Sequence, residues 1–554
     1  MQMNYTSNQT TLKLNLTWKP QLNSVAWAIN AIVDDIPTNV IQASSAPNGR
    51  PSYPPQLLLK LLSFGYLRRT FSGRKLAQMA NENLVMRWFM GNHFAIPSYR
   101  TFNRFRSNPK THGLINGRFR AFRDYLTMIG IFNRSALFID GTKILADANK
   151  YTFVWRKSLE KAEPRLDDKT ALLYQNLVEY QVSVPHLSPQ KQALTSSELV
   201  ELGTSLTLAI TDLTRKIKLE KPHRGGSTAK RRRRKLKLKH FLHVLTIDYL
   251  PRKQKYEFAE ATFGQRNSFS KTDVDATFMR MKEDPMKNGQ LKPGYNLQVA
   301  SQNQFAFYYQ LFQRPTDTRT LIPFVTHIFK QTPHAVPWLV ADAGYGSESN
   351  YQKLTDEFQV HYLIPYGMYE KEQTRAYHKD RRKVANWQYD ELNDQYTDPD
   401  GIIFAFHNYS TRHDRYGYEK QFKVYRTVEY FEDPKREALA TTQKGNRRQI
   451  SLNYNWLYFK AQAKNQLTSK IGHALYAHRK IEIEPVFADL KTYLKFKRFS
   501  VRGLTATTNE IGIALMAENL SKLSKTVKQE HIMPKKSGVN CHEPAINTTY
   551  YFRF

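Results

Sequence analysis

The sequence is almost without cysteine, since Cys541 is the only one among 554 residues. One cysteine can form no disulfide within the chain and builds no cysteine zinc site, which excludes disulfide-stapled scaffolds and zinc fingers. Long apolar runs are also missing: none approaches the roughly 20 residues that a membrane-spanning helix needs. The first 19 residues are polar and lack the apolar centre of a secretory signal. We therefore expect a cytoplasmic protein with no membrane partner.

Acidic residues are scarce relative to basic ones. The chain has 83 Lys and Arg against 48 Asp and Glu, which gives a formal net charge of +35 at pH 7. A strongly positive chain attracts anionic partners, and nucleic acid is the natural candidate. A membrane surface would also attract such a charge, but the sequence has no long amphipathic helix with a bulky apolar face. At about 150 residues per domain, the length predicts three or four structural units.

Residues 1–115 are expected to form a helical N-terminal domain. Within it, residues 97–106 are typical of a helix with Ser98 as its N-cap. At helical spacing Phe102 and Phe105 would face inward. Three polar side chains would then face outward, as on a DNA-recognition helix: Arg100, Asn103 and Arg104. An ordinary basic surface helix is the alternative interpretation.

A run of like charge stands at residues 230–235, where every residue is Lys or Arg. It belongs to a charged, helical stretch that extends from 156 to 264. Such a block is either a solubilising loop or an interaction segment. With the charge of the whole chain, we expect it to contact phosphates without reading sequence. The expected contact residues are Arg231, Arg232, Arg233 and Arg234.

Strands alternate with helices from 265 to 367, a pattern that indicates an α/β sheet. The apolar stretches Ala136–Ile139 and Trp338–Ala341 are typical of strands, and each is followed by an aspartate close to a glycine, Asp140 and Asp342. Ligands of α/β sheets gather at the carboxyl ends of strands, so parallel neighbours would bring the two carboxylates together. Taken singly, either aspartate could instead be a turn residue, because Asp-Gly is a common turn signal.

Two adjacent carboxylates repel each other, and a divalent cation resolves the repulsion. Oxygen ligands without cysteine favour Mg²⁺ or Mn²⁺ over zinc. We expect a third carboxylate from Glu484, at the start of a helix where Pro485 is tolerated. Lys491 would share its face, and Lys480 would do so only if the helix extends further back. Glu482 would point elsewhere. A surface helix with scattered charge pairs is the alternative.

Together these motifs resemble the DDE transposases of bacterial insertion sequences, which use an RNase H-like catalytic core. The resemblance covers about residues 50–525 and rests on Phe-Ile-Asp-Gly-Thr-Lys at 138–143 and Ala-Asp-Ala-Gly-Tyr-Gly at 341–346. A Tyr-Arg-Glu-Lys type signature completes it: Tyr476, Arg479, Glu484 and Lys491. The usual spacing places the glutamate four residues after the arginine, where Ile483 stands. Either Arg479 or Lys480 therefore fills the arginine position.

The resemblance implies that Asp140, Asp342 and Glu484 ligate two Mg²⁺ ions, or Mn²⁺, about 3.5–4 Å apart. Water would cleave a phosphodiester at the element's end, and the freed 3′-hydroxyl would attack target DNA. Four side chains would bind phosphate near the cleaved bond: Lys491, Tyr476, Arg479 and Lys480. The implied partners are double-stranded DNA, as element ends and target, and a second copy of the chain in a homodimer on nucleoid DNA.

The expected fold is α/β: an RNase H-like mixed sheet flanked by helices, with an N-terminal helical domain and two insertions. The expected parts are the N-terminal domain at 1–115, the core at 116–155, 265–367 and 471–525, a basic helical insertion at 156–264, a polar, tyrosine-rich and partly β insertion at 368–470, and a loose tail at 526–554. Two other functions stay open. One is an RNase H-like endonuclease or resolvase that cuts without strand transfer. The other is a non-catalytic, basic nucleic-acid-binding protein.

Overall fold

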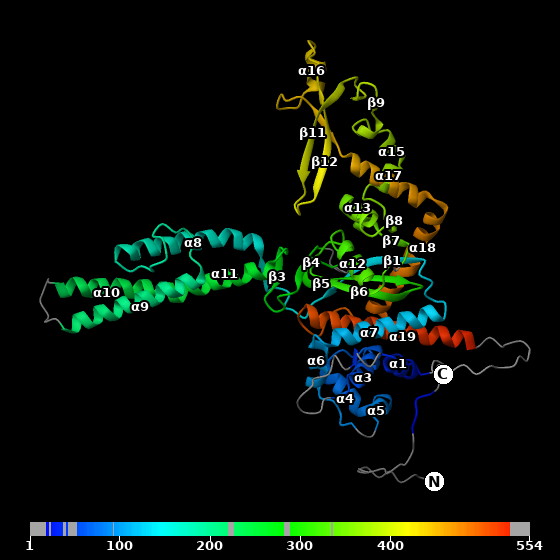
Figure 1. Cartoon of the computed structure of the whole chain (residues 1–554), viewed down its shortest axis with the longest axis horizontal. Helices are drawn as coiled ribbons and strands as arrows, with labels where there is room; N and C mark the ends of the chain where they lie inside the picture. Colours follow the sequence, from blue (N-terminus) through cyan, green and yellow to red (C-terminus); the bar gives the residue numbers. More distant parts are fainter. Residues whose placement is uncertain are drawn as a thin grey trace, which may run out of the picture. The chain divides into compact units, whose positions relative to one another are not determined.

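The computed structural model describes residues 18–21, 24–36, 40–41, 53–91, 94–219, 227–281, 288–333 and 336–531. The chain divides into two compact units (Figure 1). The first unit comprises Met1–Ile144, Asn296–Val501 and Thr505–Phe554, and the second comprises Leu145–Tyr295 and Arg502–Leu504. Among the described residues, no helix combines the length and apolar character that crossing a membrane requires.

The first unit begins with helices: α1 (Val25–Asp34), α3 (Pro55–Leu67), α4 (Gly73–Glu82), α5 (Leu84–Met90), α6 (Tyr99–Ser107) and α7 (Thr111–Met128). Ser98 caps α6, because its hydroxyl accepts a hydrogen bond from the Thr101 amide at 3.3 Å. Phe102 and Phe105 are buried, which confirms the predicted inward face of this helix. Arg100, Asn103 and Arg104 are exposed, Tyr99 and Thr101 are half-buried, and Arg106 in the last turn is buried.

The central sheet of the first unit has the strand order β6-β5-β1-β7-β8. Its strands are β1 (Ala136–Leu145), β5 (Leu291–Gln302), β6 (Phe305–Phe312), β7 (Trp338–Ala341) and β8 (His361–Leu363). β5 and β6 are antiparallel, whereas β7 runs parallel to both β1 and β8. α7 packs on β6, α18 (Lys470–Ala488) on β7, and α17 (Tyr454–Thr468) on β8. This is the RNase H-like mixed sheet with flanking helices that the sequence predicts.

β1 does not end at Asp140, so the expectation of a strand over 136–139 with Asp140 at its carboxyl end is wrong. The strand continues to Leu145. Gly141 stands inside the strand where neighbouring side chains leave no room for a Cβ, which would lie 2.3 Å from Gln298 Nε2 and 2.8 Å from Asp317 Oδ1. Here the glycine marks a close approach between strand and side chains rather than a turn. β7, by contrast, ends at Ala341, directly before Asp342.

A second, antiparallel sheet lies within residues 368–470, in the order β13-β12-β11-β10-β9 (Figure 1). Its strands are β9 (Gln388–Asp390), β10 (Gln395–Thr397), β11 (Ile403–His413), β12 (Glu419–Thr427) and β13 (Gln449–Leu452). Phe404 and Tyr425 are buried at its small core, and Trp387 packs against them. α16 (Pro434–Ala440) supplies Ala440 to the same core.

The second unit is dominated by helices α8 (Arg156–Glu179), α9 (Ser196–Leu219), α10 (Ser227–Val244) and α11 (Leu250–Phe263). Leucines on α8, α9 and α10 form a common buried cluster, for example Leu177, Leu206 and Leu238. Two short antiparallel strands, β2 (Phe153–Trp155) and β3 (Ser268–Ser270), pair at the base of these helices. β4 (Thr277–Arg280) pairs with the first residues of β5 in the same unit.

The last described helix, α19 (Leu504–His531), runs beyond residue 525, where the core was expected to end. Residues 526–531 are therefore helical, which corrects the expected start of the tail. The remaining tail, residues 532–554 with Cys541, and the first 17 residues lie outside the described residues.

Candidate active site

Asp140 and Asp342 are brought together by the pairing of β1 with β7. The two strands are parallel and place Ile139 opposite Ala341, so the next residue on each is an aspartate. Asp140 Oδ1 accepts a hydrogen bond from its neighbour Gly141 N at 2.7 Å. Asp342 Oδ1 accepts one from Gly344 N at 2.8 Å. The predicted parallel adjacency of the two strands is confirmed, and its register sets the two aspartates at corresponding positions.

A buried hydrogen-bond network lies beside this pair. Asn296 and Gln298, two residues apart on β5, are fully buried, as is Tyr345 just after β7. The Tyr345 hydroxyl donates to Gln298 Oε1. Gln298 Nε2 in turn donates to Asp317 Oδ1 at 3.0 Å, and Asn296 Nδ2 donates to the same oxygen at 2.7 Å. The network therefore joins β5, the end of β7 and the segment before α12 (Leu321–Gln331).

The pKa of the Tyr345 hydroxyl is affected by burial and by the carboxylates of Asp317, Asp140 and Asp342. Burial raises the pKa of Tyr345 well above its usual value, and the charges of Asp317, Asp140 and Asp342 raise it further. A phenol in this position stays protonated and acts as a hydrogen-bond donor. Three carboxylates consequently lie within electrostatic range of one buried hydroxyl.

Asp317 is the site residue that the sequence does not single out. Its position before a helix predicts a capping role, but the N-cap residue of α12 is Thr320. The Asp317 carboxylate instead accepts two side-chain amides from β5. The only signal for this role is the pair of amide side chains, Asn296 and Gln298, at alternate positions of the otherwise apolar stretch Tyr295–Ala300.

The donors present suit a hard divalent cation. Asp342 and Asp317 form no ion pair with Lys, Arg or His in the part of the chain that the structure describes. A divalent cation would offset the repulsion between neighbouring carboxylates, and all-oxygen donors match Mg²⁺ or Mn²⁺. Among the described residues, however, no group of three or more Asp, Glu, His or Cys is placed to hold a metal ion. The structure thus brings together Asp140 and Asp342, but does not close a three-carboxylate cluster with Glu484.

Glu484 lies on an exposed part of α18. The helix runs from Lys470 to Ala488 with Pro485 inside it, so the expectation that a helix starts at Glu484 is wrong. Ile483 and Val486 are buried and fix which face of α18 packs on the sheet. This interior packing outweighs the tendency of proline to begin a helix.

Glu482 has a structural role on the same helix. Its Oε2 accepts a hydrogen bond from Gln304 N at 3.2 Å, and its backbone carbonyl accepts one from Ser301 Oγ at 3.1 Å. These contacts hold α18 against the turn between β5 and β6. They agree with the prediction that Glu482 points away from the site.

The other signature residues lie along α18 and its continuation. Burial raises the pKa of Tyr476, Arg479 lowers it, and the charge of Asp342 adds to the increase, so Tyr476 lies within electrostatic range of Asp342. The Arg479 guanidinium lies 5.9 Å from the centroid of the Tyr476 ring. Lys480 is exposed.

Lys491 does not share its surroundings with Glu484. It stands on a π-helical turn, Asp489–Tyr493, that continues α18. Its relative exposure is 9%, whereas Glu484 is exposed. The seven-residue spacing assumed a regular α-helix, and a π-turn changes the rotation per residue. The shared face of Glu484 and Lys491 stays a prediction.

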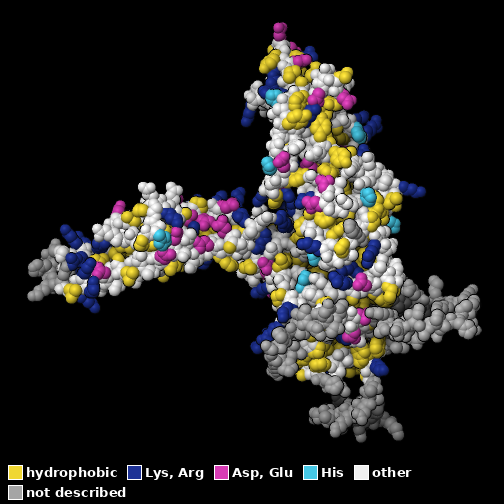
Figure 2. All heavy atoms as spheres, viewed as in Figure 1, with side chains coloured by type: hydrophobic (Ala, Val, Ile, Leu, Met, Phe, Trp, Pro, Cys, Tyr) yellow, Lys and Arg dark blue, Asp and Glu magenta, His cyan; other side chains and the backbone are white. Residues whose placement is uncertain are grey.

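The predicted DNA-contacting side chains on α6 and α10 are mostly accessible. Arg100, Asn103 and Arg104 are exposed, as are Arg232 and Arg233. Figure 2 shows Lys and Arg side chains gathered at one end of α10 in the second unit. Arg231 and Arg234 are partly buried. Arg234 donates to the carbonyl of Tyr180, a contact that links α10 to the end of α8 rather than to solvent.

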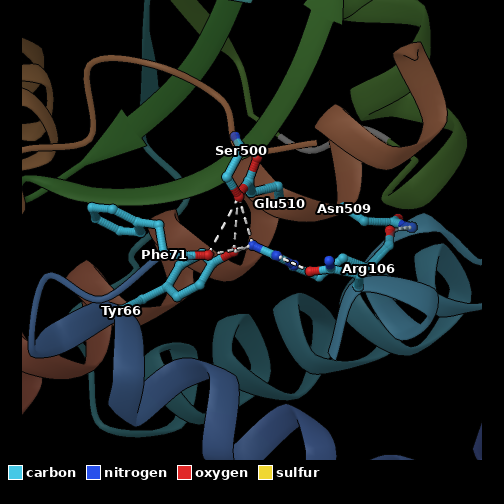
Figure 3. Close-up of polar contacts among 7 residues, drawn as sticks. Tyr66, Phe71, Arg106, Ser500, Asn509 and Glu510 are labelled. Carbon is cyan, nitrogen blue, oxygen red and sulfur yellow. Dashed lines mark hydrogen bonds and ion pairs between the residues drawn. The ribbon is translucent and has the colours of Figure 1, made fainter. Parts of the chain in front are cut away.

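A buried ion pair fixes α6 to the core of the first unit (Figure 3). Arg106 Nη1 lies 2.9 Å from Glu510 Oε1 on α19, and both side chains are almost completely buried. The same nitrogen donates to the Tyr66 hydroxyl at 3.0 Å and to Ser500 Oγ at 2.7 Å. Asn509 Nδ2 donates to the Arg106 carbonyl at 2.9 Å. The helix with the expected DNA-contacting residues is thus anchored to the segment that follows Lys491.

Two family models match the chain, and both describe transposases. The model described as a transposase DDE domain matches residues 267–520, and a transposase domain (DUF772) matches residues 17–108. Together they cover more than half of the chain, and Asp140 lies between them. No curated protein matches. One similar solved structure is the cryo-EM structure of a piggyBac transposase synaptic complex with hairpin DNA, at 10% identity over 68% of this chain and 79% of that chain. Its TM-score is 0.19, a level from which no structural inference follows.

Proposed function

The chain belongs to the DDE transposases of insertion sequences, and from that premise we propose that it cuts the ends of its own element and joins them to target DNA. The observation that carries this proposal is the pairing of β1 with β7, which sets Asp140 beside Asp342. A buried strand on each side gives both carboxylates a fixed backbone.

We propose Asp140, Asp342 and Glu484 as the residues that hold a pair of Mg²⁺ or Mn²⁺ ions. When bound, such ions supply charge for the phosphate being cleaved and lower the pKa of the attacking oxygen. Glu484 is the proposed third ligand because α18 packs on β7 and brings Tyr476 close to Asp342. We propose that the Asp317 network, which packs closely against Gly141, fixes the direction of the Asp140 side chain.

The DNA backbone is proposed to lie along cationic side chains in both units. Near the cleaved bond these are Lys491, Tyr476, Arg479 and Lys480. Further contacts would come from Arg100, Asn103 and Arg104 of α6, and from Arg231, Arg232, Arg233 and Arg234 of α10. Two copies of the chain would act together on the two element ends, in the nucleoid of a cytoplasm.

A strand-transfer assay tests this function. Full-length protein is incubated with a labelled duplex of the element's end, a supercoiled target plasmid and Mg²⁺. The wild type should yield plasmid joined to the labelled strand. Asp342→Asn should lower cleavage at least a hundredfold and keep duplex binding within about twofold, because removal of one ligand charge weakens the metal pair without altering remote phosphate contacts.

The matched control is Asp168→Asn, the same chemical change at an exposed aspartate of α8. It should leave cleavage and joining at the wild-type level. Cleavage without joined product would support an endonuclease or resolvase instead. Wild-type cleavage by Asp342→Asn would remove this residue from the site, and DNA binding with no cleavage by any form would indicate a non-catalytic binding protein.

A further inference from the structure

A hollow of about 740 Å³ opens in the antiparallel sheet of residues 368–470, remote in sequence from the aspartate pair. Its wall carries five arginines from separate segments of that region: Arg381, Arg382, Arg426, Arg447 and Arg448. We call it the arginine pocket. Two acids, Asp398 and Asp400, also line it, together with the rings of Trp387 and Phe404. The arginines of the wall outnumber its acids by three, and two of them pair with acids outside the wall, Arg382 with Asp380 and Arg447 with Glu437.

Both acids of the wall are already occupied. Asp398 Oδ1 accepts the backbone amides of Asp400 at 3.0 Å and Ile402 at 2.9 Å, which shapes the turn before β11. Asp398 Oδ2 lies 3.2 Å from Arg448 Nη1. Asp400 lies 2.6 Å from Arg381. The two acids therefore fix the shape of the wall and pair with two of its arginines, Arg448 and Arg381.

Two arginines still have hydrogen-bonding capacity to offer. Arg426, half-buried on β12, has no ion pair and no side-chain hydrogen bond in the part of the chain that the structure describes. The side chain of Arg447 is 8% exposed, between Glu437 and the ring of Tyr430. Its Nη2 lies 3.1 Å from Glu437 Oε1, yet it makes no hydrogen bond of good geometry. A buried donor left unsatisfied favours an incoming acceptor.

From this geometry we propose that the arginine pocket binds a phosphodiester group of DNA, with Arg426 as its principal contact. A guanidinium presents two parallel N–H donors that match two phosphate oxygens. The pocket volume falls within the range of ligand sites and exceeds that of a bare phosphate, so an attached sugar fits as well. The choice of DNA as the ligand rests on the proposed function, whereas the anion preference follows from the wall alone.

The test measures binding of the full-length protein to a fluorescent element-end duplex at a series of KCl concentrations. Arg426→Gln should weaken binding about tenfold, the equivalent of one charge-assisted hydrogen bond. The slope of log K against log salt should become shallower by about 0.9, as expected when the protein neutralises one phosphate fewer. Arg426→Lys should restore the slope and recover only part of the affinity, because it keeps the charge without the paired donors.

The matched control is Arg436→Gln, the same charge change at an exposed arginine of α16 outside the pocket. It should change affinity by less than twofold. Equal effects of Arg426→Gln and Arg436→Gln would overturn the proposal, provided circular dichroism shows both variants folded. If Arg426→Gln is unfolded, Arg426→Lys becomes the deciding variant. A salt slope and an affinity of Arg426→Lys that both equal the wild-type values would overturn the role of paired donors.

A second arm separates DNA from free phosphate. Phosphorus NMR of inorganic phosphate, at constant ionic strength, should show no binding that depends on Arg426. Phosphate binding that Arg426→Gln abolishes, with unchanged DNA affinity, would assign the pocket to the free anion and overturn the DNA proposal. If the wild type itself does not bind the duplex, the proposed function fails too. If the wild type binds the duplex, and Arg426→Gln and Arg436→Gln bind it with equal affinity, only the pocket proposal fails.

Discussion

At Asp317 a carboxylate is held by two buried side-chain amides, and its contribution can be separated into charge and geometry. Asp317→Asn keeps an oxygen that accepts from Asn296 and Gln298, whereas Asp317→Ala leaves both amides without their acceptor. An unsatisfied buried donor costs about 1–3 kcal/mol. We therefore expect Asp317→Ala to lower the free energy of unfolding by about 2 kcal/mol and Asp317→Asn by under about 1 kcal/mol.

Urea denaturation checks the stability difference, and cleavage rates of the same variants check the role in the site. If Asp317 acts by positioning Asp140, Asp317→Asn should retain at least a third of the wild-type rate. A loss in Asp317→Asn as large as in Asp342→Asn would show that the charge itself is required.

The aspartate pair could be predicted from the sequence, and Asp317 could not. Asp140 and Asp342 each follow an apolar run with β character, and such local patterns survive folding because the strands are buried. The role of Asp317 depends on which strand lies beside it. Its partners on β5 are 21 and 19 residues earlier in the chain, and no spacing rule connects them.

Among the secondary-structure elements, α6 and α19 are joined by the pair Arg106 and Glu510. Arg106→Met leaves the Glu510 carboxylate buried without its cation, and removal of one partner of a buried pair costs about 3–5 kcal/mol. We expect the free energy of unfolding of Arg106→Met to fall by this amount. The double variant Arg106→Met with Glu510→Gln should recover at least half of the loss, because the buried charge is then gone.

Thermal and urea unfolding of the single and double variants measure this coupling. Additive losses would contradict the assignment of the pair as one buried unit. The helix α6 also carries Arg100, Asn103 and Arg104. Arg106→Met should therefore weaken DNA binding only as far as it weakens the packing of α6 against α19. The exposed pair Arg381–Asp400 offers a comparison at which Arg381→Met should cost under about 1 kcal/mol.

Element boundaries near the site were the least predictable feature. Pro485 indicated a helix start, but α18 begins fifteen residues earlier because its buried face continues through the proline. Asp140-Gly141 indicated a strand end, but β1 continues to Leu145, and Gly141 stands where Gln298 and Asp317 approach the strand closely. In both cases tertiary packing overrides a local preference that is correct on average.

On the scale of the whole molecule, the charge of +35 is the property that the sequence reveals most directly. Exposed basic side chains occur on α6 in the first unit and on α10 in the second. Three further sequence patterns also correspond to separate parts of the described chain: the alternation of strands and helices, the block of arginines and the tyrosine-rich stretch. Composition alone does not predict whether three carboxylates that are distant in the sequence lie close together in space. That proximity depends on the order of the strands in the sheet.

The most direct test of the central claim is to locate the metal itself. Fe²⁺ replaces Mg²⁺ in the full-length protein, ascorbate and peroxide are added, and the backbone fragments are sized by mass spectrometry. We predict hydroxyl-radical cleavage close to residues 140, 342 and 484, suppressed by excess Mg²⁺ and lost in Asp342→Asn but not in Asp168→Asn. Cleavage confined to other segments, or an Asp342→Asn pattern identical to that of the wild type, would contradict it.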